Sequence, residues 1–162
     1  MAEIDIAMTR VLPELVGTHG FRRETVKGYG RVPVQTGTST CWADFVSYIY
    51  PNTGQELAYC VIEVKECYDS EVRLAEPQAE SYAQRLGAPY FCCTNGATYL
   101  WFLTGRIQGS SILLAGPPGL PDARYLRRPT FGIPAYALEA IRNFEASLVD
   151  GRDILTDTLE HH

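Results

Sequence analysis

The sequence has no long hydrophobic run and no recognisable targeting segment. No stretch of about 18 or more apolar residues occurs, which argues against a membrane-spanning helix. The N-terminus also lacks a basic segment followed by an apolar one, so no signal peptide is indicated. We therefore expect a cytoplasmic protein with no membrane partner.

Histidine is almost absent. The last four residues, 159–162, resemble the remnant of a purification tag, and without them only His19 remains. This scarcity excludes most sites built on His–Ser or His–Cys pairs and leaves a zinc site to be built almost entirely from cysteine. The five cysteines have no CxxC spacing, and we expect reduced core residues in preference to a metal site. They are Cys41, Cys60, Cys67, Cys92 and Cys93.

Lysine is scarce too, with two residues beside twelve arginines, and the net charge is -5. That charge argues against an overall basic surface for nucleic acid, but basic residues gather in two stretches. We take the first as a candidate nucleic-acid contact, with solvated loop charges as the alternative for both. The first comprises Arg22, Arg23, Lys27 and Arg31, and the second Arg124, Arg127 and Arg128.

The 162 residues, 46% hydrophobic and 20% charged, fit one globular domain, which we place at 1–158. Residues 116–119, GPPG, lack the GK[ST] ending of a phosphate-binding loop and are better interpreted as a turn. No nucleotide site is predicted in this chain.

Periodicity predicts helices over 3–16, with a kink at Pro13, and from Leu74 or Pro77 to Leu86. Apolar runs at 41–50 and 57–65 predict an antiparallel hairpin, preceded by a short strand over 28–35. PYFCC and TYLWFL predict a second hairpin turning at TNGA, a weaker strand follows at 111–115, and AYALEAIRNFEASL predicts a closing helix. The order indicates an α/β sandwich in which the strand ending at Lys65 and the one starting at Pro89 are parallel.

Three charges interrupt the first hairpin: Asp44, Glu63 and Lys65. If the loop is 51–56, Tyr50 faces Leu57, and a regular ladder then places Asp44 opposite Glu63. Two like charges so placed destabilise a sheet unless a divalent cation binds between them. The alternative is a solvated sheet face on which Lys65 forms an ordinary ion pair.

The spacing of Asp44 and Glu63-Val64-Lys65 resembles the motif of the PD-(D/E)XK nuclease superfamily. Gln78 and Tyr82 add the QxxxY spacing of its exonuclease-like branch. TRVLPELVGTHGF and PYFCCTNGATYLWF look like parts of the N-terminal nuclease domain of type I restriction enzyme R subunits. The resemblance covers about residues 3–103 and leaves 104–157 as an extension.

The resemblance implies a restriction-endonuclease-like core of helix, three-stranded antiparallel meander, helix and parallel strand, with an added hairpin strand and a C-terminal helix. It implies that Asp44 and Glu63 bind Mg²⁺, with Mn²⁺ as a substitute, helped by the Val64 carbonyl. Lys65 would position the hydrolytic water, and Gln78 and Tyr82 would lie over the site. A further acid from the first helix is left open among three residues, Glu3, Asp5 and Glu14.

The function so implied is a magnesium-dependent endonuclease domain acting on double-stranded DNA, the cleavage module of a type I R subunit. Methyltransferase and specificity subunits would be its partners, and ATP would bind only to a motor domain elsewhere in a longer chain. The alternative is a catalytically silent nuclease-like module for nucleic-acid binding or subunit assembly.

Overall fold

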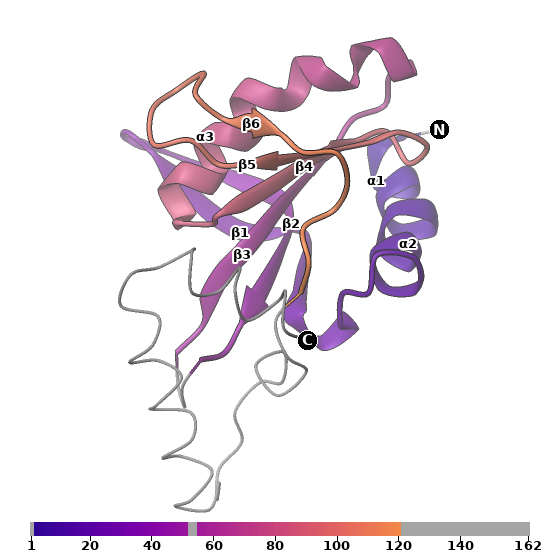
Figure 1. The fold of residues 1–162 in the computed structure, drawn as a ribbon, viewed down its shortest axis with the longest axis horizontal. Helices are drawn as coiled ribbons and strands as arrows, with labels where there is room; N and C mark the ends of the chain where they lie inside the picture. The colour runs from indigo at the N-terminus through magenta and orange to yellow at the C-terminus, as the bar shows by residue number, and fades with distance from the viewer. Residues whose placement is uncertain (1, 52–54, 121–162) are drawn as a thin grey trace, which may run out of the picture.

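The computed structural model of the protein describes residues 2–51 and 55–120. A mixed six-stranded sheet, in the order β1-β2-β3-β4-β5-β6, forms its centre. Figure 1 shows an N-terminal helical segment on one side of this sheet and helix α3 on the other. The prediction of a mixed α/β sandwich is confirmed.

The N-terminal segment is helical from Glu3 to Gly17 with one wide turn. α1 (Glu3–Ile6) leads into the π-helical turn η1 (Ala7–Val11), and α2 (Leu12–Gly17) follows. The Leu12 N–H donates to the carbonyl of Ala7, five residues back. Since Pro13 has no N–H, the wide turn before it accommodates its ring at the start of α2. The predicted helix over 3–16 is confirmed, and a π turn stands at the expected kink.

Three antiparallel strands follow the short helix η2 (Arg23–Thr25). They are β1 (Val26–Thr36), β2 (Ser39–Ile49) and β3 (Leu57–Val64). β1 is longer than the strand predicted over 28–35. Its pairing with β2 is interrupted between Gly28 and Val32, so that residues 29–31 bulge opposite the middle of β2.

The predicted pairing of Tyr50 with Leu57 is wrong, because Ile49 is the residue that faces Leu57. A bulge between Ser47 and Tyr48 leaves Tyr59 of β3 without a partner, and beyond it Ser47 pairs with Cys60. From Ser47 to Phe45, the pairing therefore follows the register that the sequence predicts for the whole hairpin.

The second half of the described chain follows the predicted order. After η3 (Asp69–Ala75) and α3 (Glu76–Leu86), β4 (Tyr90–Thr94) runs parallel to β3. β5 (Tyr99–Leu103) pairs antiparallel with β4 across the Asn-Gly turn, and the short β6 (Ile112–Leu113) pairs with β5. The predicted parallel pair and the added hairpin strand are confirmed.

Each face of the sheet carries a core cluster. The first core cluster joins the N-terminal helical segment to one face, and the second joins η3 and α3 to the other. The first includes Val11, Leu15, Phe45, Ile62, Val64 and Trp101; the second includes Val32, Val61, Ala79, Tyr82, Phe91 and Cys93. All five cysteines are free, and Cys60, Cys92 and Cys93 are buried, as expected of reduced core residues.

Two predictions lie outside the described residues: the closing helix in AYALEAIRNFEASL and the basic stretch at Arg124, Arg127 and Arg128. Within residues 2–51 and 55–120, no helix combines the length and the apolar character needed to cross a membrane.

Candidate active site

The structure brings the two predicted carboxylates together at the end of the β2–β3 ladder. Phe45 pairs with Ile62, and the next position along the ladder is Asp44 on β2 and Glu63 on β3. One carboxylate oxygen of Asp44, Oδ2, accepts a hydrogen bond of 2.7 Å from the backbone N–H of Val64. This bond fixes Asp44 against β3.

Glu63 is buried to an unusual degree for a carboxylate, with a relative exposure of 3%. Its Oε1 has no hydrogen-bond partner among the described residues. Burial first, and then the hydrogen bond and negative charge of Asp44, raise the pKa of Glu63 well above its ordinary value; the Asp44 backbone and Lys65 oppose this. In the absence of a cation, this rise favours the protonated form of Glu63 at neutral pH.

Lys65 directly follows β3 and is half-buried. Its backbone N–H donates to the Thr94 carbonyl at 2.9 Å, which extends the parallel pairing by one residue. Its positive charge lowers the pKa of Glu63 and of two cysteines, Cys67 and Cys93. Cys93 is the β4 partner of Glu63, so Lys65 lies beside the carboxyl pair, where the sequence placed it.

Gln78 and Tyr82 form a hydrogen-bonded pair on α3. The Gln78 amide donates to the Tyr82 hydroxyl at 2.8 Å, since residues four apart share one helix face. Tyr82 packs in the second core cluster, whereas Gln78 is exposed. Burial raises the pKa of Tyr82, and the Glu63 carboxyl contributes to that rise, so the pair lies on the side of the sheet to which Glu63 points.

Val64, predicted as a carbonyl ligand, is fully buried, and its side chain belongs to the first core cluster. It therefore points to the face opposite Glu63, as strand alternation requires. Its contact with the site is through its backbone, whose N–H donates to Asp44.

Among the three acids of the first helix, Glu3 is the one whose charge acts on residues around the carboxyl pair. Its charge raises the pKa of Tyr29 and of Cys67, both of which also respond to charges of the site. Glu14 instead acts on His19 and Tyr99, at the other end of the helical segment. The helix direction, which the sequence did not disclose, thus puts Glu3 on the side of the carboxyl pair and Glu14 away from it.

Sequence reasoning missed Tyr29 as a residue of this site. Burial and the charges of Asp44, Glu3 and Glu63 raise its pKa, and its ring contacts that of Phe45 at a centroid distance of 5.9 Å. It lies in the β1 bulge opposite Asp44, a position that no local pattern marks.

Asn95 was interpreted only as a turn residue, yet it also holds the loop that follows Lys65. Its amide nitrogen donates to the Cys67 carbonyl at 3.0 Å and to Asp69 at 2.7 Å. Its oxygen accepts the N–H groups of Ala97 and Thr98 at 3.0 and 2.8 Å. The Asn-Gly pair in the sequence predicts the turn. Only the fold shows that the amide nitrogen of Asn95 reaches the loop at Cys67 and Asp69.

The first basic stretch does not form one free surface. Lys27 makes an ion pair of 2.6 Å with Glu56 and lies over the Tyr48 ring. Arg23 donates to the Val26 carbonyl at 3.1 Å. Arg22 is half-buried and Arg31 is exposed on β1. Lys27 is therefore paired within the protein, which weakens its role in the predicted nucleic-acid contact.

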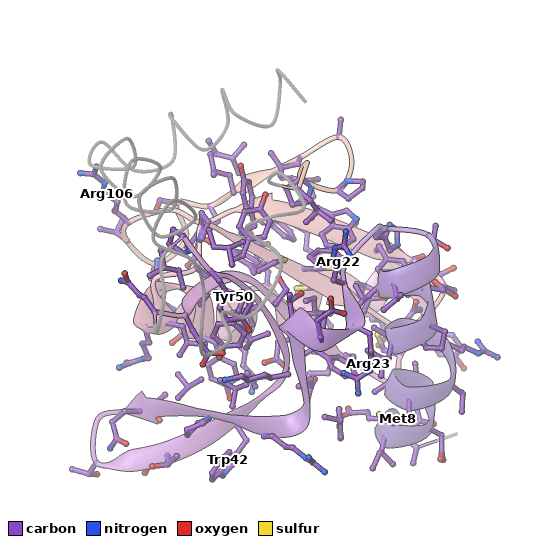
Figure 2. The ribbon with its side chains drawn as sticks, turned by 90° about the horizontal axis from the view of Figure 1, so that it is seen from below. Met8, Arg22, Arg23, Trp42, Tyr50 and Arg106 are labelled. Carbon is purple, nitrogen blue, oxygen red and sulfur yellow. The ribbon has the colours of Figure 1, made fainter. Side chains whose placement is uncertain are left out.

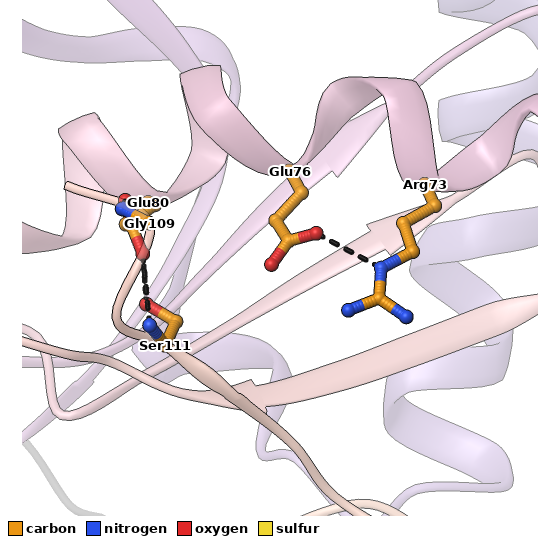
Figure 3. A network of polar contacts seen from close by, with 5 residues as sticks. All are labelled: Arg73, Glu76, Glu80, Gly109 and Ser111. Atoms are coloured by element: carbon orange, nitrogen blue, oxygen red, sulfur yellow. Dashed lines mark hydrogen bonds and ion pairs between the residues drawn. The ribbon is translucent and has the colours of Figure 1, made fainter.

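A separate carboxylate on α3 anchors the loop before β6. Glu80, with 1% relative exposure, accepts the N–H groups of Gly109 (2.6 Å) and Ser111 (3.1 Å) and the hydroxyl of Ser111 (Figure 3). The same view shows Arg73 paired with Glu76 at 3.0 Å. Glu80 is thus buried with its oxygens satisfied, in contrast to Glu63.

In the described part of the chain, no group of three or more His, Cys, Asp and Glu side chains is arranged to hold a metal ion. Two carboxylates would therefore need backbone and water oxygens to complete a coordination sphere. A comparison of the chain with models of protein families, with curated proteins and with solved structures finds no match in any of the three.

Proposed function

We propose that this domain hydrolyses phosphodiester bonds of DNA in a magnesium-dependent reaction at Asp44, Glu63 and Lys65. The observation that carries the proposal is the carboxyl pair, in which the buried Glu63 keeps an oxygen without a hydrogen-bond partner beside the half-buried Asp44. An unsatisfied buried oxygen lowers the stability of the folded state by roughly 1 to 3 kcal/mol. We therefore expect an oxygen that the fold keeps in this state to have a function.

The donors fit a magnesium ion. Asp44 and Glu63 offer carboxylate oxygens, among them the unpartnered Oε1 of Glu63, and these are hard ligands of the kind that Mg²⁺ prefers. Asp44, Glu63 and the Val64 carbonyl would hold the ion, with Mn²⁺ as a substitute. A bound ion lowers the pKa of a coordinated water and offsets negative charge at the phosphate.

The protein's own residues supply the rest. The Lys65 ammonium holds the attacking water and stabilises the negative charge that develops on the phosphate oxygens. Deprotonation of Glu63, favoured when cationic charge is close, converts the carboxyl pair into two acceptors. The hydrogen bond between Gln78 and Tyr82 fixes an amide over this side of the sheet, where it orients the DNA strand or the catalytic groups.

DNA as the substrate rests on the resemblance to PD-(D/E)XK nucleases, whose core of helix, meander, helix and parallel strand follows the same element order as residues 3–103. Within that superfamily we propose the cleavage module of a type I restriction R subunit, which works with methyltransferase and specificity subunits and with an ATP-driven motor. On the same resemblance we propose that the domain acts in the cytoplasm.

Plasmid nicking in the presence of Mg²⁺ or Mn²⁺ tests the proposal. We expect wild-type nicking to be lost in Asp44→Ala and in Lys65→Ala, and retained in Arg106→Gln, a matched change at an exposed loop. Activity that survives the first two substitutions would show that the site is elsewhere.

Calorimetry with Mn²⁺ provides a readout that does not depend on partner subunits. Wild-type protein should bind the ion, and Asp44→Asn should bind it much more weakly. Mn²⁺ binding without nicking would support the metal site and point to a requirement for partners, whereas absence of both favours the catalytically silent module.

A further inference from the structure

The part of the β1–β2 hairpin beyond Asp44, residues 31–42, forms an arm with one buried and one exposed face. Val32, Val34 and Ala43 pack in the second core cluster with α3, and Arg85 of α3 donates to the Gln35 carbonyl at 3.0 Å. The arm is thus held against the body of the domain along one face. Its position is fixed before any partner arrives.

The opposite face of the arm is exposed and carries a large aromatic side chain. Trp42 pairs with Pro33 across the hairpin and has a relative exposure of 55%. Arg31, the last residue of the β1 bulge, is exposed as well, and exposure alternates from Arg31 through buried Val32 to exposed Pro33, which places Arg31 on the same face. Figure 2 shows Trp42 on the arm where it projects from the sheet.

The charge on this hairpin is one-sided. The chain has 19 acidic residues and a net charge of -5, yet none of the acids falls between Thr25 and Ala43. The only charged side chains there are two cations, and Lys27 is neutralised by Glu56. Arg31 is therefore the cation of this hairpin that can bind a partner. The arm also carries neutral hydrogen-bonding groups, since the Thr40 hydroxyl donates to the Gln35 amide oxygen at 3.1 Å.

We propose that this arm binds the DNA strand that enters the active site, with Arg31 on a phosphate and Trp42 packed against a nucleoside. The inference rests on the proposed function and adds the surface that holds its substrate. An exposed aromatic side chain beside a cation and neutral hydrogen-bonding groups matches a nucleotide, which has a π face and one negative charge. Trp42 precedes Asp44 by two residues on the same strand, roughly 7 Å along it, so the arm begins next to the carboxyl pair.

The fluorescence of the protein makes the contact visible. Of the two tryptophans, Trp101 is 3% exposed in the first core cluster and Trp42 is the accessible one. The probe is a short DNA duplex with a single-stranded tail, added in EDTA so that no cleavage occurs. We expect the probe to quench the emission of Trp42 and to leave that of Trp101 unchanged in the Trp42→Phe variant.

Binding of the same probe, followed by anisotropy, gives the magnitudes. Base-to-aromatic stacking contributes about 1 to 3 kcal/mol, so Trp42→Ala should weaken binding ~5- to ~150-fold and Trp42→Phe less. Arg31→Gln should reduce the slope of log K against log salt by about 0.9. Arg106→Gln should bind as wild type, because Figure 2 shows this exposed residue at the opposite edge of the view from Trp42, and so should Ile107→Ala, at the exposed residue that follows it.

Each outcome separates the two proposals. Arm-dependent binding with neither Mn²⁺ binding nor metal-dependent nicking would overturn the nuclease function and leave the arm as a DNA contact. Wild-type affinity and salt slope in both Trp42→Ala and Arg31→Gln, with circular dichroism showing that both are folded, would overturn the arm alone. Equal quenching by poly-glutamate would show that the surface takes an acidic peptide and would also overturn it.

Discussion

Replacement of Glu63 by glutamine should stabilise the metal-free protein increasingly as the pH rises. A carboxyl group whose pKa is higher in the folded than in the unfolded chain takes up a proton on folding. Below the ordinary value of 4.5, Glu63 is protonated in both states and has no differential effect. Above it, the unfolded chain loses its proton first, and wild-type stability falls until the pH reaches the raised value of the folded state.

The size of the effect follows from one proton. A full difference of one bound proton changes the free energy of unfolding by about 1.4 kcal/mol per pH unit, so wild type should lose up to about 2.7 kcal/mol between pH 6 and 8 through this group. Glutamine cannot ionise, and its amide can donate to Asp44 in place of the Glu63 proton. The Glu63→Gln curve should therefore lack this part of the decline.

Urea unfolding of both proteins in EDTA at pH 6, 7 and 8 measures the difference. Adding Mg²⁺ should restore wild-type stability at the higher pH, because binding to the folded state displaces the proton, and should do much less for Glu63→Gln. If the wild-type and Glu63→Gln stabilities change in parallel with pH, the pKa of Glu63 is not raised in the folded protein.

Glu80→Gln is the matched control, since Glu80 is equally buried but its oxygens accept hydrogen bonds from Gly109 and Ser111. Glutamine can accept at only one of its two polar ends. This variant should lose roughly 1 to 3 kcal/mol at every pH, with no gain at pH 8.

Two further changes test how the site is supported. Gly28→Ala would place its Cβ 2.3 Å from the Phe45 ring and 2.4 Å from the Asp44 carbonyl, so we expect a loss of ~2 kcal/mol or more in unfolding experiments and weaker Mn²⁺ binding in calorimetry. Gly37→Ala, with positive φ but no atom within 4 Å, should lose only ~1 kcal/mol and bind Mn²⁺ normally; equal effects of the two would contradict the close approach at Asp44. Asn95→Ala leaves the Cys67 carbonyl without its donor, and we expect a loss of roughly 1 to 3 kcal/mol with faster hydrogen exchange at residues 66–69. Unchanged exchange there would show that the amide does not order this loop.

Local patterns in the sequence were sufficient for the elements and for their order. Helical spacing over 3–16, two apolar runs around a polar loop, and the Asn-Gly pair at the second turn depend on backbone preferences that act over a few residues. The parallel relation of β3 and β4 followed from the helix between them. The spacing of Asp44, Glu63 and Lys65 identified the candidate residues before any contact was known.

Tertiary structure decided what those residues experience. The predicted register at Tyr50 and Leu57 was wrong, and the carboxyl pair still meets because the bulge at Tyr59 compensates, which is a long-range property of the sheet. The burial of Glu63 depends on α3 and β4 covering it, and Lys27 is removed from the basic stretch by Glu56, 29 residues away.

Sequence by itself thus determined which side chains this domain has available and on which elements they lie. Only the fold determined that two carboxyl groups lie together with Glu63 buried, that Glu3 and not Glu14 is the helix acid on that side, and that Trp42 stays exposed on an arm without acids. The physical reason is that spacing along a chain fixes direction within an element, whereas burial and charge depend on neighbours from other elements.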